Sequence, residues 1–151
     1  MVATSTTPTV RMFETADLDA ICNRDGAQIS REAIEVQTAL GPTWTACLDD
    51  QPIAIGGITL PWPGIGMAWM IVGEQMAPYR IWFTRTTKRF LLDTIHRYNL
   101  HRVEAQALEE SLTNQYWLER LGFHVEHNGR AQAYLADART IIRYEWIRGG
   151  V

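Results

Sequence analysis

The sequence has few cysteines and no recognisable metal-ligand spacing. Of its 151 residues only Cys22 and Cys47 are cysteines, and neither lies in a C-x-x-C or Cys/His cluster. No disulfide framework or zinc site is therefore predicted. His124 and His127 are three residues apart, but in a strand this spacing places the two side chains on opposite faces. We expect free thiols, a reducing compartment and no bound metal.

Long apolar runs and an excess of positive charge are also absent. Residues 1–9 are polar and lack the apolar core of a signal peptide, and no apolar run is long enough to span a bilayer. The 14 Lys and Arg residues against 17 Asp and Glu residues give a net charge of -3, which makes nucleic acid an unlikely partner. These absences predict a cytoplasmic protein without a membrane partner, with residues 1–9 as a flexible tail.

The composition that remains suits one globular domain. Hydrophobic residues make up 46% of the chain and charged residues 21%, which is enough for a core without disulfides or metal. No repeat or linker interrupts the sequence, so residues 10–151 are predicted to form a single domain. Six tryptophans are many for this length. They are compatible with a pocket wall, with an interface such as that of a homodimer, or with an aromatic core.

Hydrophobic periodicity predicts the element order β-α-α-β-β-β-α-β-α-β-β. A small hairpin around Asn128-Gly129, a tight-turn sequence, adds an eighth strand near the end of this order. The expected strands cover residues 10–13, 43–48, 52–60, 67–72, 102–107, 124–127, 131–135 and 140–146, and the expected helices begin near residues 15, 30, 79 and 111. The expected turns and loops cover residues 23–27, 49–51, 61–66 and 73–79, and the turn at 49–51 joins strands 43–48 and 52–60 in a β-hairpin. The helix that begins near residue 30 is expected to bury Ala33, Ile34 and Leu40, and Gly122 is expected to end the last helix in a left-handed conformation.

Two of these elements carry further expectations. Residues 67–72 form a continuous apolar run, which is typical of a strand buried on both faces. Residues 79–98 repeat apolar side chains at three- and four-residue steps, as an amphipathic helix does. The apolar positions of this helix are Phe83, Thr87, Phe90, Leu91, Ile95 and Tyr98, and its first half carries Arg80, Arg85, Lys88 and Arg89.

The order of the elements, with three local segments, resembles the GNAT superfamily of N-acetyltransferases. Residues 10–21 are similar to its strand-then-helix opening and residues 51–57 to its second hairpin. Residues 111–123 are similar to its penultimate helix, which commonly ends in Leu-Gly-Phe, as here. The resemblance covers nearly the whole chain. It implies a three-layer α/β (α+β) fold with a mixed, mostly antiparallel central sheet flanked by helices, and transfer of an acetyl group from acetyl-CoA to an amine.

A closer likeness is to the small acetyltransferase-like proteins of short-tailed phages, which are encoded beside internal virion proteins. Pro-x-Ala-Ile-Gly-Gly at residues 52–57, the apolar strand, the basic helix and residues 114–123 carry it. This likeness implies a phage origin, and a place in the host cytoplasm or the virion. It also leaves a second function open, in which a catalytically inactive protein binds a phage or host protein during virion assembly.

The resemblance implies a pyrophosphate site, Gln/Arg-x-x-Gly-x-Gly/Ala, at the start of a helix. At the corresponding positions Gln75 keeps the first residue, but Pro78 and Arg80 replace two small ones, and proline has no N–H to donate. One interpretation is that Arg80 and Arg85, with Lys88, bind the phosphates through their side chains. The alternatives are that the coenzyme site is lost, or that the basic run is a solvated helix face.

Further coenzyme contacts follow from the same resemblance. In this fold the central strand separates from its neighbour, and its free backbone groups bind the pantetheine arm. Trp69 to Val72 occupy this strand, which makes Met70, Ile71 and Val72 expected cofactor-binding residues. The family's Asn at the start of the penultimate helix corresponds to Ser111, for which helix capping is the simpler role. Asn114, in the first turn, completes the expected contacts.

The catalytic residues are less well marked. Glu74 follows the central strand and is the predicted general base, with Glu104 and His124 as alternatives. The family's acid is often a Tyr four residues before the Gly of Leu-Gly-Phe, where this chain has Leu118. Tyr116 is the remaining candidate acid, although it lies roughly 200° around the helix from that position. A packing role for Tyr116 is the alternative.

Overall fold

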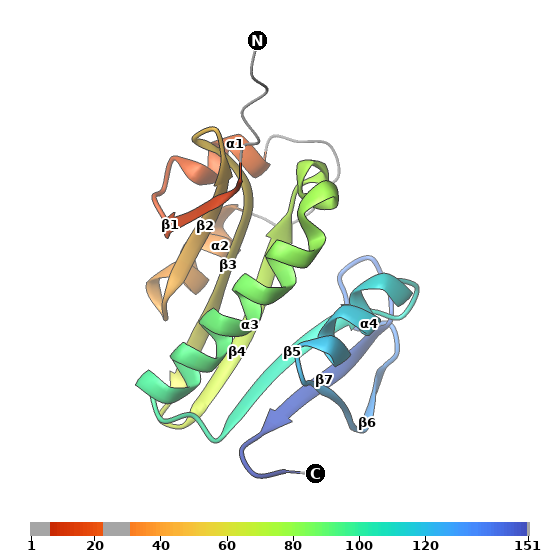
Figure 1. Cartoon of the computed structure of the whole chain (residues 1–151). Coiled ribbons are helices and arrows are strands. Elements are labelled where there is room, and N and C mark those ends of the chain that lie inside the picture. Colours follow the sequence, from red (N-terminus) through yellow and green to blue (C-terminus); the bar gives the residue numbers. More distant parts are fainter. Residues whose placement is uncertain (1–6, 23–30, 151) are drawn as a thin grey trace. The chain divides into compact units, whose positions relative to one another are not determined.

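The computed structural model describes residues 7–22 and 31–150 (Figure 1). The predicted turn at 23–27 and the predicted helix start at Ser30 lie outside them. The elements are β1 (Thr9–Met12), α1 (Asp17–Cys22), α2 (Arg31–Ala39), β2 (Thr43–Leu48), β3 (Gln51–Trp62), β4 (Ile65–Val72), the 3₁₀ helix η1 (Glu74–Tyr79), α3 (Arg80–Arg97), β5 (Arg102–Leu108), α4 (Leu112–Arg120), β6 (His124–Ala131) and β7 (Ile141–Ile147).

The strands form a seven-stranded sheet in the order β1-β2-β3-β4-β5-β7-β6. β4 and β5 are parallel, whereas β1 with β2, β2 with β3, β5 with β7, and β6 with β7 are antiparallel. The predicted fold class, a mixed and mostly antiparallel sheet flanked by helices, is confirmed. None of the described helices has the length and apolar character needed to cross a membrane.

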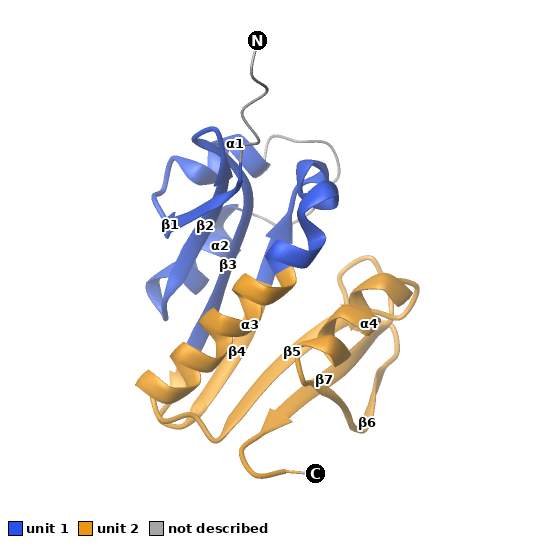
Figure 2. Cartoon of the chain, viewed as in Figure 1, with its two compact units in different colours: residues 1–59, 70–83 blue, residues 60–69, 84–151 orange. Residues whose placement is uncertain are grey.

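The chain forms two compact units (Figure 2). Unit 1 contains residues 1–59 and 70–83, and unit 2 contains residues 60–69 and 84–151. β3, β4 and α3 therefore each contribute residues to both units. The single domain expected over residues 10–151 stays a prediction, and Thr9, placed in the expected tail, already belongs to β1.

The β2–β3 hairpin is the centre of unit 1, and its prediction is confirmed. Leu48 pairs with Gln51, so the connection is the two residues Asp49 and Asp50, with φ of 49° and 62°. Positive φ at both positions is the signature of a tight hairpin turn whose twist suits the strands. The buried side chains of this unit include Leu18, Ile21, Ile34, Ile53, Ile55 and Ile58.

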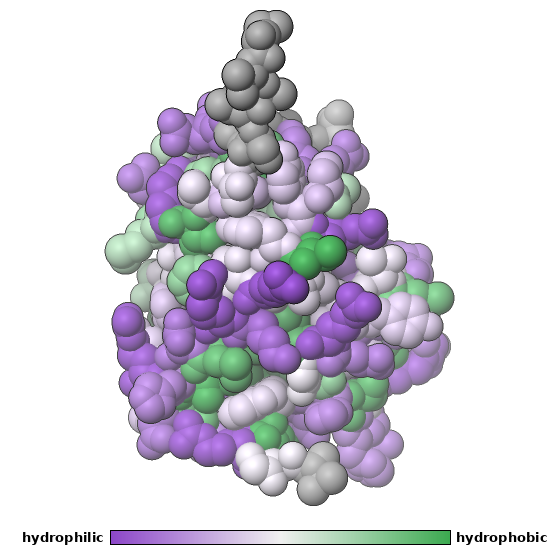
Figure 3. Space-filling model, in the orientation of Figure 1, coloured by the Kyte–Doolittle hydropathy of each residue, from purple (hydrophilic) through white to green (hydrophobic). Residues whose placement is uncertain are grey.

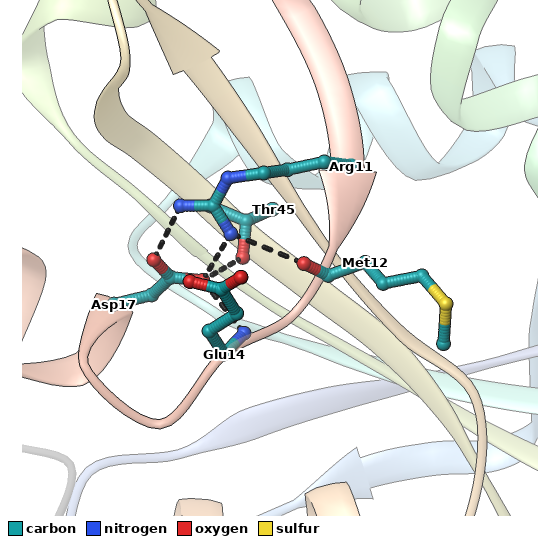
Figure 4. Close-up of polar contacts among 5 residues, drawn as sticks. All are labelled: Arg11, Met12, Glu14, Asp17 and Thr45. Atoms are coloured by element: carbon teal, nitrogen blue, oxygen red, sulfur yellow. Dashed lines mark hydrogen bonds and ion pairs between the residues drawn. The ribbon is translucent and has the colours of Figure 1, made fainter.

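A buried carboxylate fastens the start of unit 1 to this hairpin (Figure 4). Asp17, at the first turn of α1, is only 3% exposed and accepts two hydrogen bonds from the Arg11 guanidinium, at 2.6 and 2.9 Å. The Thr45 hydroxyl of β2 donates a third bond at 2.7 Å, and the Glu14 backbone N–H a fourth at 2.9 Å. A buried charge is tolerated only when it is paired and hydrogen-bonded, and here both conditions hold.

The same bonds set the pKa of Asp17. Burial raises it, but the hydrogen bonds from Arg11, the Glu14 N–H and Thr45 outweigh burial and hold the pKa below its usual value. A carboxyl whose pKa is depressed by folding stabilises the folded state above its unfolded pKa, and this contribution disappears as pH falls through the folded pKa. The Asp17 contribution is therefore complete at neutral pH and is lost only in strong acid.

Unit 2 is built on β5, β7 and β6. Tyr144 of β7 and Val103 of β5 are 1% and 0% exposed, and α4 packs on β5. The predicted apolar face of the long helix is largely confirmed, since Phe83, Thr87, Leu91 and Ile95 are all buried. Tyr98, which was expected to continue this face, lies just after α3 and is 41% exposed.

Three predicted details of the chain are wrong. The hairpin of 124–127 with 131–135 does not form, because β6 continues through Asn128-Gly129 and pairs with β7, with a register shift between Val125 and Arg130. The two turn residues are accommodated in this irregularity, where Asn128 has φ of 55°. The expected loop at 61–66 is shorter, because β3 extends to Trp62 and β4 begins at Ile65. Of the residues expected on the buried face of the second helix, Ile34 is buried, whereas Ala33 is exposed and Leu40 lies exposed just after α2.

Asp17→Asn is expected to lower the free energy of unfolding by about 2 kcal/mol at pH 7, because it removes the charge from a buried ion pair whose Arg11 partner is partly solvent-screened. Urea unfolding checks this. The difference from the wild type should stay constant down to about pH 4 and shrink below it, as the wild-type carboxyl protonates. Asp19→Asn is the matched control, because Asp19 pairs with Arg31 at an exposed site. Equal losses for both variants would contradict the role assigned to Asp17.

Candidate functional site

The central strand β4 is apolar but only partly buried. Met67 and Val72 are 47% and 49% exposed, whereas Ile71 is 7% exposed, so the expectation of burial on both faces is wrong. Apolar composition favours burial without requiring it, since much of any protein surface is apolar. The parallel pairing of β4 with β5 joins residues 65–67 to residues 102–104. This pairing therefore ends before Met70, Ile71 and Val72.

The predicted loop at 73–79 is a short helix. After β4 the Gly73 N–H donates to the Ile53 carbonyl at 2.7 Å, and the Met76 N–H donates to the Gly73 carbonyl at 3.1 Å. Met76 is 2% exposed and anchors η1 in the core of unit 1. The apparent loop composition reflects Pro78, which lies near the end of η1, two residues before α3 begins. Glu74 and Gln75 thus lie in a helical turn.

Arg80 is the first residue of α3 and already has helical backbone angles, φ -57° and ψ -39°. η1 therefore leads directly into α3, and Gln75 and Arg80 stand on one continuous helical path within unit 1. Farther along α3, in unit 2, Arg85, Lys88 and Arg89 are exposed. Much of the face on which α3 lies is hydrophilic in Figure 3. Three cations within two helical turns make this part of α3 suitable for an anionic ligand.

α4 ends in the predicted left-handed glycine, Gly122, with φ of 101°. The Phe123 N–H donates to the Leu118 carbonyl and the Gly122 N–H to the Glu119 carbonyl, which is the bonding pattern of a Schellman motif. Leu118 and Phe123 are 8% and 2% exposed. Leu118, where the resemblance implies an acid, is therefore a buried apolar residue at the C-terminal end of this helix.

Unlike Leu118, the candidate site residues of α4 and its N-cap are not buried. Tyr116 is 63% exposed, so the alternative of a packing tyrosine is wrong and its hydroxyl is accessible to solvent. Ser111 occupies the N-cap position, but its side chain makes no capping hydrogen bond, so capping does not account for it. Asn114 is exposed in the first turn. Arg85, Ser111, Asn114 and Tyr116 all belong to unit 2.

The two alternative bases also lie in unit 2. Glu104 accepts a hydrogen bond from Arg102 at 2.8 Å, and Glu145 accepts another at 2.5 Å, while Glu126 lies 3.7 Å from the same guanidinium. The hydrogen bond to Glu104, against the opposing effect of burial, raises the pKa of Arg102. Glu104 is thus an ion-pair partner in this cluster, whereas His124 is exposed on β6. No group of three His, Cys, Asp or Glu residues suited to a metal ion occurs in residues 7–22 and 31–150.

Two tryptophans have indole N–H groups whose hydrogen bonding cannot be predicted from the sequence patterns. Trp117 of α4 donates its indole N–H to the Thr84 hydroxyl of α3 at 3.0 Å, which ties the two helices of unit 2 together. Trp69 of β4 has a buried indole nitrogen without a hydrogen-bond partner among the described residues. The surplus of tryptophan was the only signal for either feature.

Gly73→Ala is expected to lower the free energy of unfolding by about 1 kcal/mol, because the added Cβ would meet the Ile53 carbonyl oxygen at 3.0 Å and the Gln75 side-chain oxygen at 2.9 Å. Chemical denaturation measures the loss. Gln75 can move aside but the Ile53 backbone cannot, so Gly73→Ala with Gln75→Ala should remain destabilised. Gln75→Ala alone should unfold like the wild type. Wild-type stability of the Gly73→Ala protein would show that this turn is not a close contact.

Comparison with known proteins bears on the fold. No protein-family model matches the sequence, and no curated protein matches it. Among solved structures, Ard1 from Thermoplasma volcanium superposes with a TM-score of 0.79 at 12% identity, covering 93% of this chain and 97% of that one. The ribosomal-protein-S18-alanine N-acetyltransferase from Escherichia coli gives 0.75 at 14% identity, covering 93% and 94%.

A third structure, the acetyltransferase of GNAT family from Streptococcus pneumoniae, gives a TM-score of 0.65 at 19% identity, covering 93% of this chain and 99% of that one. Each neighbour is matched over nearly its full length, so the likeness extends to the whole chain and not to one motif. Sequence identities this low carry information about architecture alone. The chain therefore has the fold of the GNAT acetyltransferases.

Proposed function

We propose that the chain is an N-acetyltransferase that uses acetyl-CoA and an amine acceptor. The observation that carries the proposal is the end of the β4–β5 pairing at Met67 and Glu104, directly before the strand residues that lead into η1 and α3. In a fold shared with acetyltransferases over 93% of the chain, this is the stretch whose backbone groups suit the amides of a pantetheine arm. The partial exposure of Met70 and Val72 supports access to it.

The proposed coenzyme contacts differ in kind along the chain. Met70, Ile71 and Val72 supply backbone N–H and C=O groups. Gln75 and Arg80, on the helical path that follows, supply side-chain donors for the pyrophosphate in place of the glycine-rich loop that this chain lacks. Hydrogen bonds from guanidinium groups to phosphate are charge-assisted and strong, so they suit this substitution. Arg85, Ser111 and Asn114 are the further proposed contacts.

Each catalytic side chain handles one proton. Acetyl-CoA, when bound, supplies an acetyl group activated as a thioester. Glu74 accepts a proton from the acceptor's ammonium group, which frees the nitrogen lone pair to form the new C–N bond as the C–S bond breaks. Tyr116 donates a proton to the departing sulfur, and the proton released by the amine in forming the amide restores the proton balance through solvent. Both side chains are exposed, so each can exchange protons with solvent directly.

Arg85→Ala is expected to weaken acetyl-CoA binding by roughly tenfold, because one charge-assisted bond to phosphate contributes about 1.5 kcal/mol or more. Isothermal titration at two salt concentrations measures the dissociation constant and its salt dependence. Arg97→Ala is the matched control, since it removes an exposed arginine from the other end of the same helix, about 18 Å away by the helical rise. No heat with the wild type at millimolar acetyl-CoA would contradict the proposed function.

Glu74→Gln is expected to lower kcat/KM for acetyl transfer by about a hundredfold, the usual effect of removing a general base. Tyr116→Phe should lower kcat by about tenfold and leave acetyl-CoA binding unchanged, since only the proton donor is removed. A thiol-release assay with a panel of primary amines measures both. Circular dichroism confirms folding, which neither exposed substitution should alter. Wild-type rates in both variants would remove the two side chains from the mechanism.

A second function has one specific observation in its favour. Leu118 occupies the position of the family's general acid and is buried at the C-terminal end of α4. A chain that keeps the acetyltransferase fold but has lost acetyl transfer would have such a residue. On this view the protein is phage-encoded, and it binds a phage or host protein during virion assembly. Mass spectrometry of purified particles would detect it there. Coenzyme turnover by the purified protein would instead support the acetyltransferase.

A further inference from the structure

The indole nitrogen of Trp69 is an exception within the structure. It is the one buried side-chain nitrogen or oxygen, among the described side chains, that has no hydrogen-bond partner. Buried polar groups are nearly always hydrogen-bonded, because leaving one unpaired is destabilising. An indole N–H can only donate. The missing partner of Trp69 is therefore an acceptor, such as an oxygen atom that a ligand brings.

Two other tryptophans of the chain differ from Trp69, because one is hydrogen-bonded and the other is exposed. Trp117 donates to the Thr84 hydroxyl at 3.0 Å. Trp62 is 63% exposed, so solvent surrounds it. Trp69 has neither a protein partner nor solvent at its nitrogen, and this makes its position on the strand informative.

Trp69 lies at a particular point of β4. It follows Met67, the last β4 residue paired with β5, by two positions and therefore shares a face of the strand with it. It directly precedes Met70, Ile71 and Val72, the residues proposed to line the pantetheine arm. Met67 and Ile71, the neighbouring side chains on the same face of the strand, are apolar, and an apolar setting favours a neutral acceptor over an anionic one. A carbonyl oxygen fits this description, and a phosphate does not.

We propose that the Trp69 indole N–H is a binding residue for a carbonyl oxygen of the acyl-pantetheine arm of the coenzyme. This inference rests on the proposed function and adds to it a side-chain donor beside the backbone groups of β4. Two carbonyl sources share this chemistry: the thioester of the acetyl group and the amides of pantetheine. In the free protein the donor is unpaired and destabilising, and in the complex it is satisfied.

The test replaces Trp69 with 3-benzothienylalanine, in which sulfur takes the place of the N–H and the shape is retained. Two opposite effects are expected. Binding of acetyl-CoA should weaken by roughly threefold to tenfold, the effect of losing one neutral hydrogen bond. The midpoint of thermal unfolding of the free protein should rise by about 2–5 °C, because an unpaired buried donor has been removed. A purely structural tryptophan would not weaken binding while stabilising the protein.

The same replacement at two other tryptophans provides the controls. At Trp62 it should change neither binding nor stability, because that indole is exposed. At Trp117 it should lower the unfolding midpoint, because the bond to Thr84 is lost. Titration with coenzyme A lacking the acetyl group separates the two carbonyl sources. A loss confined to acetyl-CoA identifies the thioester oxygen, and an equal loss with both ligands identifies a pantetheine amide.

Failure of this inference can be told apart from failure of the proposed function. If the wild type binds acetyl-CoA and the Trp69 replacement binds it equally tightly, the donor role is overturned while the proposed function stands. If the wild type binds neither ligand, the proposed function is overturned and the inference with it. A replacement that weakens binding only because it unfolds the protein would show a lowered midpoint, which is opposite to the expected shift and also overturns the inference.

Discussion

The short parallel pairing of β4 with β5 is the constraint on which the rest of the structure depends. A parallel neighbour cannot be reached by a tight turn, so the chain needs a crossover connection, and η1 with α3 provides it. The pairing joins three residues of each strand. It thereby fixes where β4 stops pairing with β5, and the β4 residues after that point are those for which a ligand role is proposed.

The sequence was informative wherever one local signal decided the structure. Apolar side chains at helical spacing located α3, and Phe83, Leu91 and Ile95 are buried as expected. Gly122 marked the end of α4 because few other residues adopt a φ of 101° at low cost. The Asp49-Asp50 turn followed from its composition. In each case the energetic preference is local, so it can be read from a few neighbouring residues.

Predictions were wrong where tertiary pairing outweighed a local signal. Asn128-Gly129 is a strong turn sequence, yet β6 runs through it because pairing with β7 extends to Ala131. Pro78 and Gly73 suggested a loop, but the burial of Met76 stabilises a helical turn. The candidate site was less predictable still. Neither the Trp117–Thr84 bond nor the orphan indole of Trp69 has a sequence signature, since each depends on contacts made or missed in three dimensions.

Leu118 shows how one position can decide between stability and chemistry. Its carbonyl accepts the Phe123 N–H, and both side chains are buried, so an apolar residue here stabilises the end of α4. A tyrosine at the same position would have to place its hydroxyl outside that contact or bury it at a cost. Tyr116, two residues earlier, points to solvent and bears no such constraint. If the chain transfers protons from α4, it therefore does so from the exposed face of the helix, where Tyr116 lies.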